Sequence, residues 1–600
     1  MTRSSLLLIA FALATIPTMA QHPTIEYSLG MSNPSTHIYE VGVVIQRLPA
    51  RTPTLNLVLP VWRTGRYKIL DLAGGVVDFS ATDGADKSLP WQKTDKTTWQ
   101  ISIQGASTLK VTYRVYANEF GERTRGLNDE HGFVDPTGVF MYPDHFEDLP
   151  LGITVSPYGT WHVTTSLIPE KDASNRFTAP NYQYFADSPL EIGNQHDFPF
   201  DVDGKPHVLS ISGEGNWNAD SLIRDITTLV NANKKYWGDL PYDHYVFFLL
   251  LTTQGGGGTE HLNSCVMDTH PFSFKNPGSY LGVIGLISHE YVHTWNVKQL
   301  RPRGLKPYDW TKENYTKELW IAEGSTSYIS GLIKTRAGFN SAKAYLDGIS
   351  GAVQGDRQRP GNRVQSLSES SFDAWVKFWQ GTEDSYNTES DYYSKGANVS
   401  MLLDLEIRQQ SNNRHSFDDL MRTMYRRFPL NGPGYTVADF QKVAEELAGV
   451  NLEKFFNDYV FGVKPLDWER YLGYAGLLLT PKEGSPVPWI GVGNSDAGEK
   501  IVINRIVDGS PAYDVGLNIR DEIIALNGRR VKPAEFKNRL ADFAIGDTIT
   551  LTIFRADRLR NFNVALKAQP VPSYQTSKVG TPSALQKSIY ESWLKTTWGE

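Results

Sequence analysis

The first third of the chain alternates apolar and polar side chains with a period of two. The clearest alternating runs, each between turn residues, cover positions 38–46, 55–62, 99–103 and 109–117. Such alternation predicts strands that turn one face toward a core. Residues 21–210 are therefore expected to form a β-rich, sandwich-like domain, and no catalytic constellation is visible in it.

Near residue 220 the apolar period lengthens toward that of a helix. Positions 219–237 predict an amphipathic helix, 244–252 predict a strand, and four glycines follow at 255–258. Further helices are predicted over 280–296, 317–337, 398–410, 416–428 and 437–448. A strand and a glycine turn that lead into a helical body predict an α+β domain, here over residues 211–480.

The C-terminal part returns to short strands, with one helix predicted over 533–544, inside a domain expected over residues 485–568. Residues 569–600 form a polar tail. Its large apolar residues are Ile589, Tyr590, Trp593 and Trp598. We find no repeat of fixed period.

Length, charge and the N-terminus narrow the class of protein. A chain of 600 residues is too long for one core, and a net charge of -7 gives no basic footprint for nucleic acid. An apolar run over 6–16, with Arg3 before it and Ala20 after it, predicts a signal peptide over residues 1–20 and export to the periplasm or the medium. Cys265 is the only cysteine, so no intrachain disulfide is possible. No other apolar run is long enough to cross a membrane.

The sharpest motif is His289-Glu290-x-x-His293. On a helix the two histidines project from one face, and both can reach one zinc ion at about 2.0–2.1 Å. Glu290 can then accept a proton from a zinc-bound water. Residues 281–287 are mostly apolar, so the motif is expected to be buried, and a metal would offset the cost of burying its polar groups.

Two histidines leave zinc short of a third protein ligand. Glu323 is the best candidate, because it lies thirty residues beyond His293 on a second predicted helix. The set would be His₂Glu, with one open position for water or substrate. Glu318, five residues earlier, is the competing carboxylate and falls roughly on another face of that helix.

These residues resemble a known group of enzymes. The spacing of His289, His293 and Glu323 is similar to that of the gluzincin metallopeptidases. The longer strings HEYVHTWNVKQLRP and LWIAEGSTSY resemble peptidase family sixty-one, the glycyl aminopeptidases. The resemblance covers nearly the whole mature chain. It implies a multidomain α+β protein with an N-terminal β-sandwich-like domain, a thermolysin-like, mostly helical catalytic domain, and a C-terminal PDZ domain.

The same resemblance gives roles to two further segments. Residues 257–261 are similar to the GxMEN motif of related aminopeptidases, which implies that Glu260 holds the substrate's free α-amine beside Gly257 and Gly258. Thr259 stands where relatives are expected to carry an apolar residue.

Residues 392–396 resemble the Y-x-K-G segment of the gluzincin aminopeptidases. The match implies that Tyr393 donates a hydrogen bond to the developing oxyanion, with Tyr392 as the alternative.

Segments 489–492, 509–512, 516–517, 521–523 and 527–528 follow the bacterial PDZ pattern. Such domains hold an extended peptide C-terminus against a sheet edge. A groove blocked by the protein's own chain is the alternative.

The expected activity is that of an aminopeptidase with one zinc ion, acting on peptides with a free N-terminus. By resemblance it prefers Gly or Ala as the first residue. An endopeptidase with the same zinc site and a structural Glu260 is the nearest rival, and N-blocked peptides separate the two. A non-catalytic, PDZ-based peptide-binding protein is a rival of another class, whereas a carbohydrate-binding scaffold has no support at residue level. Neither nucleic acid nor a membrane span is expected.

Overall fold

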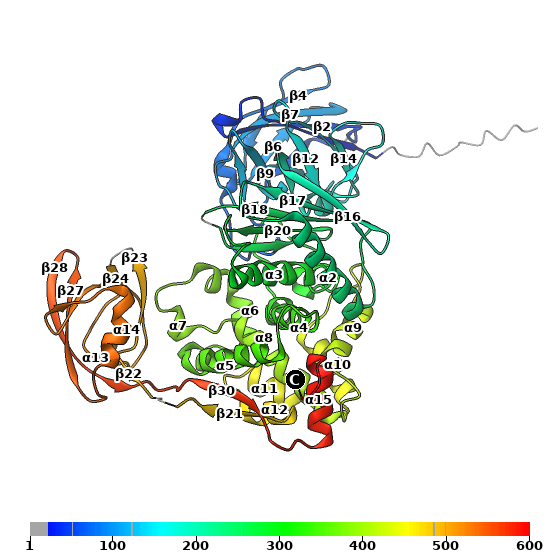
Figure 1. The fold of residues 1–600 in the computed structure, drawn as a ribbon. Coiled ribbons are helices and arrows are strands. Elements are labelled where there is room, and N and C mark those ends of the chain that lie inside the picture. The colour runs from blue at the N-terminus through cyan, green and yellow to red at the C-terminus, as the bar shows by residue number, and fades with distance from the viewer. Residues whose placement is uncertain are drawn as a thin grey trace, which may run out of the picture.

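The computed structural model describes residues 22–50, 52–121, 124–253, 255–483, 486–497 and 500–599 (Figure 1). The signal peptide expected over residues 1–20 lies outside the described residues. Figure 1 shows three parts: a β-rich part at the top, a helical part below it, and a smaller β-rich part at the left.

The β-rich part begins with three sheets. The largest has the order β13 (Ile168–Pro169), β14 (Arg176–Ala179), β11 (Leu151–Ser156), β1 (Thr24–Gly30), β2 (Ile38–Gln46), β7 (Thr108–Tyr116) and β4 (Val76–Asp83). The second has the order β10 (Tyr142–Pro143), β3 (Thr54–Val58), β6 (Thr98–Ser102) and β5 (Trp91–Lys93). The third has the order β12 (His162–Thr165), β15 (Leu190–Gly193), β9 (His131–Val134) and β8 (Arg125–Leu127). Along β2 the burial alternates, so its apolar side chains point into the core as the period of two predicts.

A five-stranded sheet connects the β-rich part to the helices. Its order is β16 (His196–Val202), β17 (Lys205–Ser212), β18 (Tyr245–Leu251), β20 (Ser264–Thr269) and β19 (Gly257–Glu260). β17, β18 and β20 are parallel, and β19 returns antiparallel to β20. The sheet takes strands from both sides of position 210, and the domain boundary expected there stays a prediction.

The helical part packs beneath this sheet (Figure 1). Its main helices are α2 (Ala219–Trp237), α3 (Pro277–Val292), α4 (Thr326–Arg336), α5 (Ala342–Gln358), α8 (Ser394–Gln410), α9 (Phe417–Arg427), α10 (Val437–Ala448), α11 (Glu453–Tyr459) and α12 (Trp468–Tyr474). Shorter helices are α1 (Tyr182–Ala186), which lies within the β-rich part, α6 (Leu367–Phe372) and α7 (Ser385–Thr388). One continuous hydrophobic core runs from the first β strands through these helices.

The third part has a hydrophobic core of its own. Its sheet contains β23 (Val492–Ala497), β24 (Lys500–Ile506), β25 (Glu522–Leu526), β27 (Thr548–Arg555) and β28 (Arg558–Ala565), with β26 (Arg529–Arg530) paired to β25. A short pair, β22 (Pro488–Trp489) and β29 (Lys567–Ala568), and the helices α13 (Pro511–Asp514) and α14 (Pro533–Ala541) complete it.

The tail returns to the helical part. β30 (Tyr574–Lys578) pairs antiparallel with β21 (Leu477–Pro481), and α15 (Ala584–Leu594) packs beside α12 (Figure 1). Ile589, Tyr590 and Trp593 are fully buried there. Among the residues that the structure describes, no helix combines the length and the apolar character that a membrane crossing requires.

Candidate active site

Two histidines come from the end of one helix. Asn276 caps α3 through the Ser279 N–H, and Pro277 occupies its first turn. The helix carries His289 and ends at Val292, so that His293 is its C-cap. Their Nε2 atoms lie 3.1 Å apart, and the His293 ring is fully buried. The spacing of four therefore brings both ring nitrogens to one point, as expected.

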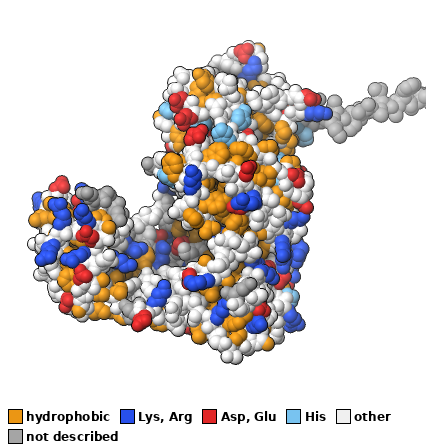
Figure 2. Space-filling model, in the orientation of Figure 1, with side chains coloured by type: hydrophobic (Ala, Val, Ile, Leu, Met, Phe, Trp, Pro, Cys, Tyr) orange, Lys and Arg blue, Asp and Glu red, His pale blue; other side chains and the backbone are white. Residues whose placement is uncertain are grey.

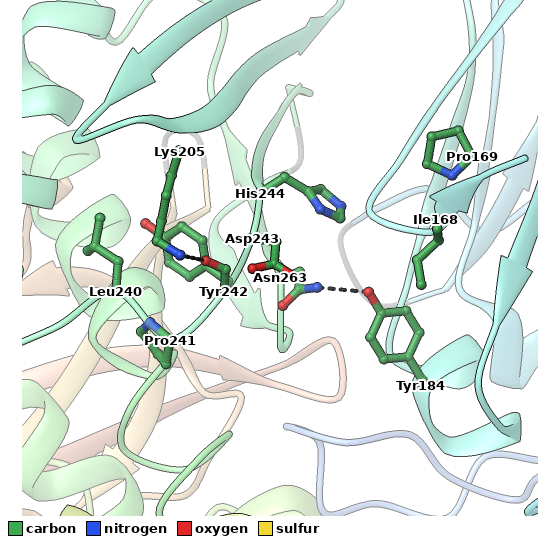
Figure 3. A pocket seen from close by; sticks show the side chains of 10 residues that line it. All are labelled: Ile168, Pro169, Tyr184, Lys205, Leu240, Pro241, Tyr242, Asp243, His244 and Asn263. Carbon is green, nitrogen blue, oxygen red and sulfur yellow. Dashed lines mark hydrogen bonds between the residues drawn. The ribbon is translucent and has the colours of Figure 1, made fainter. Parts of the chain in front are cut away.

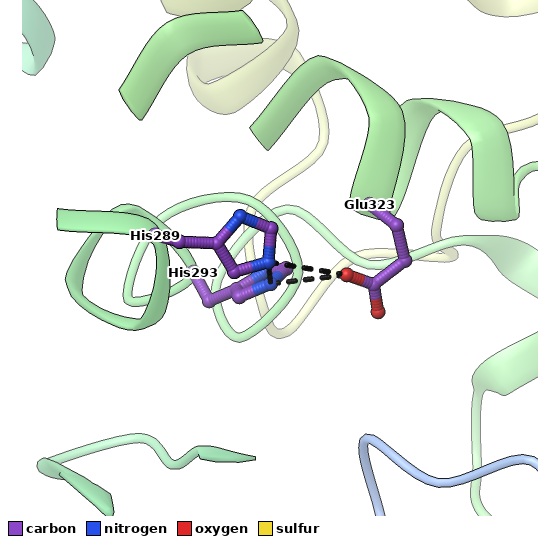
Figure 4. Close-up of side chains that lie close together, drawn as sticks. All are labelled: His289, His293 and Glu323. Atoms are coloured by element: carbon purple, nitrogen blue, oxygen red, sulfur yellow. Dashed lines mark hydrogen bonds and ion pairs between the residues drawn. The ribbon is translucent and has the colours of Figure 1, made fainter. Parts of the chain in front are cut away.

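Glu323 meets them from a π-helical turn, Trp320–Ser325, that leads into α4. Its Oε2 lies 3.1 Å from His293 Nε2 and 3.7 Å from His289 Nε2 (Figure 4). The competing carboxylate lies elsewhere: Glu318 accepts hydrogen bonds from the N–H groups of Lys317 and Val437.

The three donor atoms fit a tetrahedral zinc ion. Ligands at 2.0–2.1 Å around such an ion lie roughly 3.3 Å from one another. The distances of 3.1, 3.1 and 3.7 Å between these atoms are close to that value. Neutral imidazole and carboxylate are also ligand types that zinc accepts.

A hydrogen bond fixes the tautomer of His293. Its Nδ1 lies 2.7 Å from the carbonyl oxygen of Asn296, which can only accept, so Nδ1 carries a proton and Nε2 is the nitrogen that can ligate a metal once it is deprotonated. The Asn296 amide donates to the carbonyl of Ile321 and to the Thr326 hydroxyl. Asn296 thus connects the end of α3 to the turn that carries Glu323.

Electrostatics prepare these groups for a cation. Burial lowers the pKa of His289, which keeps that ring neutral. Burial alone would raise the pKa of Glu323, but the two histidines outweigh it and lower that pKa to about 2. Burial also acts to lower the pKa of His293, but Glu323 outweighs it and raises that pKa to about 10. A metal must therefore displace a proton from this ring, so that its binding is favoured as the pH rises.

Two more carboxylates face this point. Oxygens of Glu260 and Glu290 lie within 4.8 Å of each other and of a His293 nitrogen, and all three residues are buried. A Cβ on Gly258 would be 2.4 Å from the Glu290 carboxyl carbon, so β19 crosses Glu290 where only glycine fits. This contact gives a structural reason for Gly258, for which the sequence suggested only a role beside the substrate.

The two neighbouring tyrosines lie in different surroundings. The Tyr393 ring centroid is 6.3 Å from that of His289. Tyr392 is fully buried, and its hydroxyl accepts a hydrogen bond of 3.0 Å from the Trp379 indole. Tyr393 therefore has the better position beside the metal ligands.

The N-terminal β domain also reaches the site, which the sequence did not indicate. In its 63–67 loop Gly65 has φ +79°, and a Cβ there would lie 2.5 Å from a Glu260 oxygen. The Arg63 guanidinium donates to the Thr259 hydroxyl at 2.7 Å. The charges of Glu323 and Glu260 add to burial in raising the pKa of Tyr67. The sequence offered only one signal, a Gly between two arginines.

A separate cavity of about 640 Å³ lies away from these residues (Figure 3). Asn263 donates to the Tyr184 hydroxyl at 2.8 Å on its wall, and Lys205 donates to the Tyr242 carbonyl. It contains none of the predicted site residues.

Comparisons with known proteins agree with this architecture. The peptidase M61 N-terminal domain matches residues 26–194, the M61 glycyl aminopeptidase family matches residues 282–399, and the PDZ domain matches residues 488–566. No curated protein matches the chain.

Solved structures are similar over most of the chain. The crystal structure of an aminopeptidase N family protein from Idiomarina loihiensis is 25% identical, with a TM-score of 0.88 over 95% of this chain and 100% of that one. An M1 zinc metallopeptidase from Deinococcus radiodurans is 13% identical, with a TM-score of 0.46 over 74% of this chain and 94% of that one. The expected order of a β-rich domain, a helical catalytic domain and a PDZ domain is confirmed. The chain therefore carries a region that matches the N-terminal domain of peptidase family M61, a region that matches the M61 glycyl aminopeptidase family, and a PDZ domain after them.

Proposed function

We propose that this protein is a zinc-dependent aminopeptidase that removes small N-terminal residues, Gly or Ala, from peptides. One observation carries the proposal: the donor atoms of His289, His293 and Glu323 converge, and the carboxylates of Glu260 and Glu290 lie beside them. This arrangement suits a metal with a general base on one side and an anchor for an ammonium on the other.

The residues divide the chemistry among them. Zinc bound to His289, His293 and Glu323 would polarise the scissile carbonyl and lower the pKa of a water at the open position. Glu290 accepts the proton of the attacking water and passes it to the leaving amine. The Tyr393 hydroxyl donates to the oxygen that gains negative charge.

Glu260 accounts for attack at the first peptide bond. A buried carboxylate pairs with the substrate's α-ammonium and fixes the distance from that ammonium to the scissile carbonyl. The backbone of Gly65 lies against the same carboxylate, and the preference for a small first side chain is carried over from the family resemblance. The family description as glycyl aminopeptidases agrees with this preference.

Export to the periplasm or the medium, following removal of residues 1–20, is part of the proposal and rests on the sequence alone. For the PDZ domain we propose a peptide C-terminus as ligand, since β23 lies at one edge of its described sheet.

The deciding experiment uses the zinc-loaded protein and Gly-Ala-Ala-Phe, free and N-acetylated, with mass-spectrometric detection of released glycine. We expect release from the free peptide only, abolished by chelator and restored by zinc. Glu290→Gln should lower kcat by about 10³-fold or more at unchanged zinc content, because the base is lost while the ligands remain.

Two outcomes would contradict the proposal. Cleavage of the acetylated peptide at an internal bond favours the rival endopeptidase, in which Glu260 is structural. No turnover of either peptide by folded, zinc-loaded protein favours the non-catalytic peptide-binding protein.

A further inference from the structure

A buried ion pair lies next to the segments that hold Glu260. Lys298 Nζ is 2.7 Å from Asp187 Oδ1, and neither charge has more than a tenth of its side chain exposed. Lys298 follows the zinc-binding motif, and its N–H donates to the carbonyl of His293. Asp187 follows α1 in the N-terminal β domain. The pair thus joins the two domains directly behind the catalytic helix.

Asp187 also holds the turn that follows Glu260. Its Oδ2 accepts from the Leu262 N–H at 2.8 Å, and its Oδ1 lies 3.2 Å from His261 Nδ1. The His261 N–H in turn closes the hairpin on the Ser264 carbonyl. Because His261 is the next residue after Glu260, the Asp187 carboxylate fixes the backbone at the end of β19.

The same pair holds the loop that contacts Glu260 from the other side. Lys298 Nζ is 3.1 Å from the Thr64 hydroxyl, which is itself 3.2 Å from Asp187 Oδ1. Thr64 precedes Gly65, the residue whose backbone crowds the Glu260 carboxylate. The two segments that flank the Glu260 carboxylate, the 63–67 loop and the turn after β19, therefore both contact one buried ion pair.

Stability alone is a weak reason for such an arrangement. A buried ion pair loses much of its attraction to desolvation, and apolar residues of similar volume are often as stable. Burial acts to raise the pKa of Asp187, but Lys298 and His261 outweigh it and hold that pKa far below its usual range. The pair therefore stays charged at neutral pH and keeps one geometry.

We infer that Asp187 and Lys298 are positioning residues that set the Glu260 carboxylate and the Gly65 backbone for recognition of the substrate's α-ammonium. This inference rests on the proposed aminopeptidase activity. Neither residue contacts the reacting atoms; both act through the 63–67 loop and the turn after Glu260.

A double-mutant cycle tests the inference. Asp187→Asn keeps the size of the side chain but removes its charge. It also replaces one carboxylate oxygen, which accepts hydrogen bonds in the wild type, with an NH₂ group that can only donate. On Gly-p-nitroanilide we expect kcat/KM to fall about ten-fold, mainly through KM, as for residues coupled through one hydrogen-bond network. In the Glu260→Gln background the same change should cost less than about two-fold, because the carboxylate that it positions is already gone. An equal loss in both backgrounds would overturn the inference.

A matched control separates positioning from general stability. Asp404 and Arg408 form another buried ion pair, 2.8 Å apart, on α8. Asp404→Asn should lower Tm as Asp187→Asn does, with no change in KM and no coupling to Glu260→Gln. A rise in KM equal to that of Asp187→Asn would show that any buried pair has this effect.

A crystal structure of Asp187→Asn decides the question without turnover. We expect Glu260 to move away from Gly65 while His289, His293 and Glu323 stay in place. An unmoved Glu260 would refute the positioning role even if the wild-type protein hydrolyses no peptide. Absence of hydrolysis by the wild type, by contrast, refutes the proposed function alone.

Discussion

At the scale of single residues, the neighbouring tyrosines Tyr392 and Tyr393 lie in different surroundings, from which we expect different roles. Tyr393 lies beside His289, whereas the Tyr392 hydroxyl is occupied by the Trp379 indole. Tyr393→Phe should lower kcat by about 10²–10³-fold, the usual cost of losing one oxyanion donor. Tyr392→Phe should leave kcat nearly unchanged and cost about 0.5–1.5 kcal/mol of stability, because the half-buried Trp379 indole N–H loses this hydrogen bond. Steady-state kinetics and thermal denaturation of both variants measure these changes in kcat and stability. An equal loss of kcat in the two variants would show that Tyr393 is not the specific oxyanion donor.

His131 gives a pH-dependent prediction that is independent of the metal. Its Nδ1 lies 2.7 Å from the fully buried Glu191, which also accepts from the Ser212 hydroxyl. Burial acts to lower the pKa of His131, but Glu191, with a smaller contribution from Glu130, outweighs it and raises that pKa. The stabilisation is therefore complete below the unfolded value of about 6.5 and is lost as the pH rises through the folded pKa.

His131→Gln should accordingly destabilise the protein more at pH 5.5 than at pH 9. Glutamine keeps a hydrogen-bond donor near Glu191 but cannot become charged, so the difference isolates the ion pair. The measurement is Tm of both proteins across that pH range. A gap in Tm that is constant, or that widens toward alkaline pH, would contradict the assignment.

The residues named from motifs and from the family resemblance lie close together in the structure, whereas contacts that no motif indicates were not expected. His289, Glu290 and His293 form a motif because one helical turn sets their spacing. Gly65 and Asp187 approach Glu260 and Lys298 across many intervening residues. No local pattern encodes such contacts, so the part of the N-terminal domain in the site was missed.

At the scale of elements, helix existence was predicted more reliably than helix ends. The helix expected over 280–296 is α3, Pro277–Val292. Its start has a local cause, the Asn276 cap before Pro277, which the sequence displays. Its end does not, because the backbone beyond His293 is held by contacts from Asn296 to the Glu323 turn. The helix expected over 317–337 begins as a π turn for a similar tertiary reason.

That π turn depends on close contact with α8. A Cβ on Gly396 would lie 2.9 Å from the Trp320 carbonyl oxygen and 3.1 Å from the Gly324 Cα. Backbone atoms cannot yield as a flexible side chain does, so Gly396→Ala should move the turn and displace Glu323. We expect zinc affinity to fall about ten-fold or more, as for other changes that disorient a ligand. Competitive chelator titration measures this affinity.

Gly351→Ala on α5 is the matched control, because a Cβ there meets nothing within 4 Å. Alanine in an open helical position should leave zinc affinity unchanged and stabilise the helix by about 0.5–1 kcal/mol. If both substitutions weaken zinc binding equally, close packing between the π turn and α8 is not what places Glu323.

At the scale of the whole molecule, the PDZ domain is inserted into the helical part. Its chain leaves through β21 and returns through β30, and these two strands pair with each other. The order of domains was predictable from motifs. The return of the tail was not, although its buried Ile589, Tyr590 and Trp593 were visible as apolar residues in a polar segment. Figure 2 shows that the molecule is hollowed between the PDZ domain and the rest of the chain.

Contacts between the PDZ domain and the peptidase involve α7 and Glu383 just before it, which lies 3.4 Å from the Arg520 guanidinium. Asn387 donates to the Ile506 carbonyl and accepts from the Asp508 N–H. The Arg505 guanidinium lies 4.1 Å from the centre of the Tyr386 ring. α7 precedes Tyr393 by a few residues. The PDZ domain therefore contacts the segment that leads to the proposed oxyanion donor, without contributing to the core of the peptidase.

This topology predicts that the PDZ domain is dispensable for folding and the tail is not. Pro481 is opposite Tyr574, and the Lys482 N–H donates to the Ser573 carbonyl. An Asn-Gly turn that replaces residues 483–572 should therefore close a hairpin without strain. We expect this variant to fold, bind zinc and hydrolyse Gly-p-nitroanilide with kcat/KM close to that of the full chain.

Truncation after Ala568 should have the opposite effect. It removes β30 and α15, including Trp593, which donates to the Tyr328 hydroxyl and accepts from Arg336. Loss of one buried tryptophan alone costs about 3–5 kcal/mol, a large part of the stability of a typical domain. Circular dichroism, zinc content and turnover of the two variants test the pair. A folded, zinc-loaded excision variant whose kcat falls more than about ten-fold would instead show that the contacts of Asn387 and Tyr386 hold the Tyr393 segment in its active position.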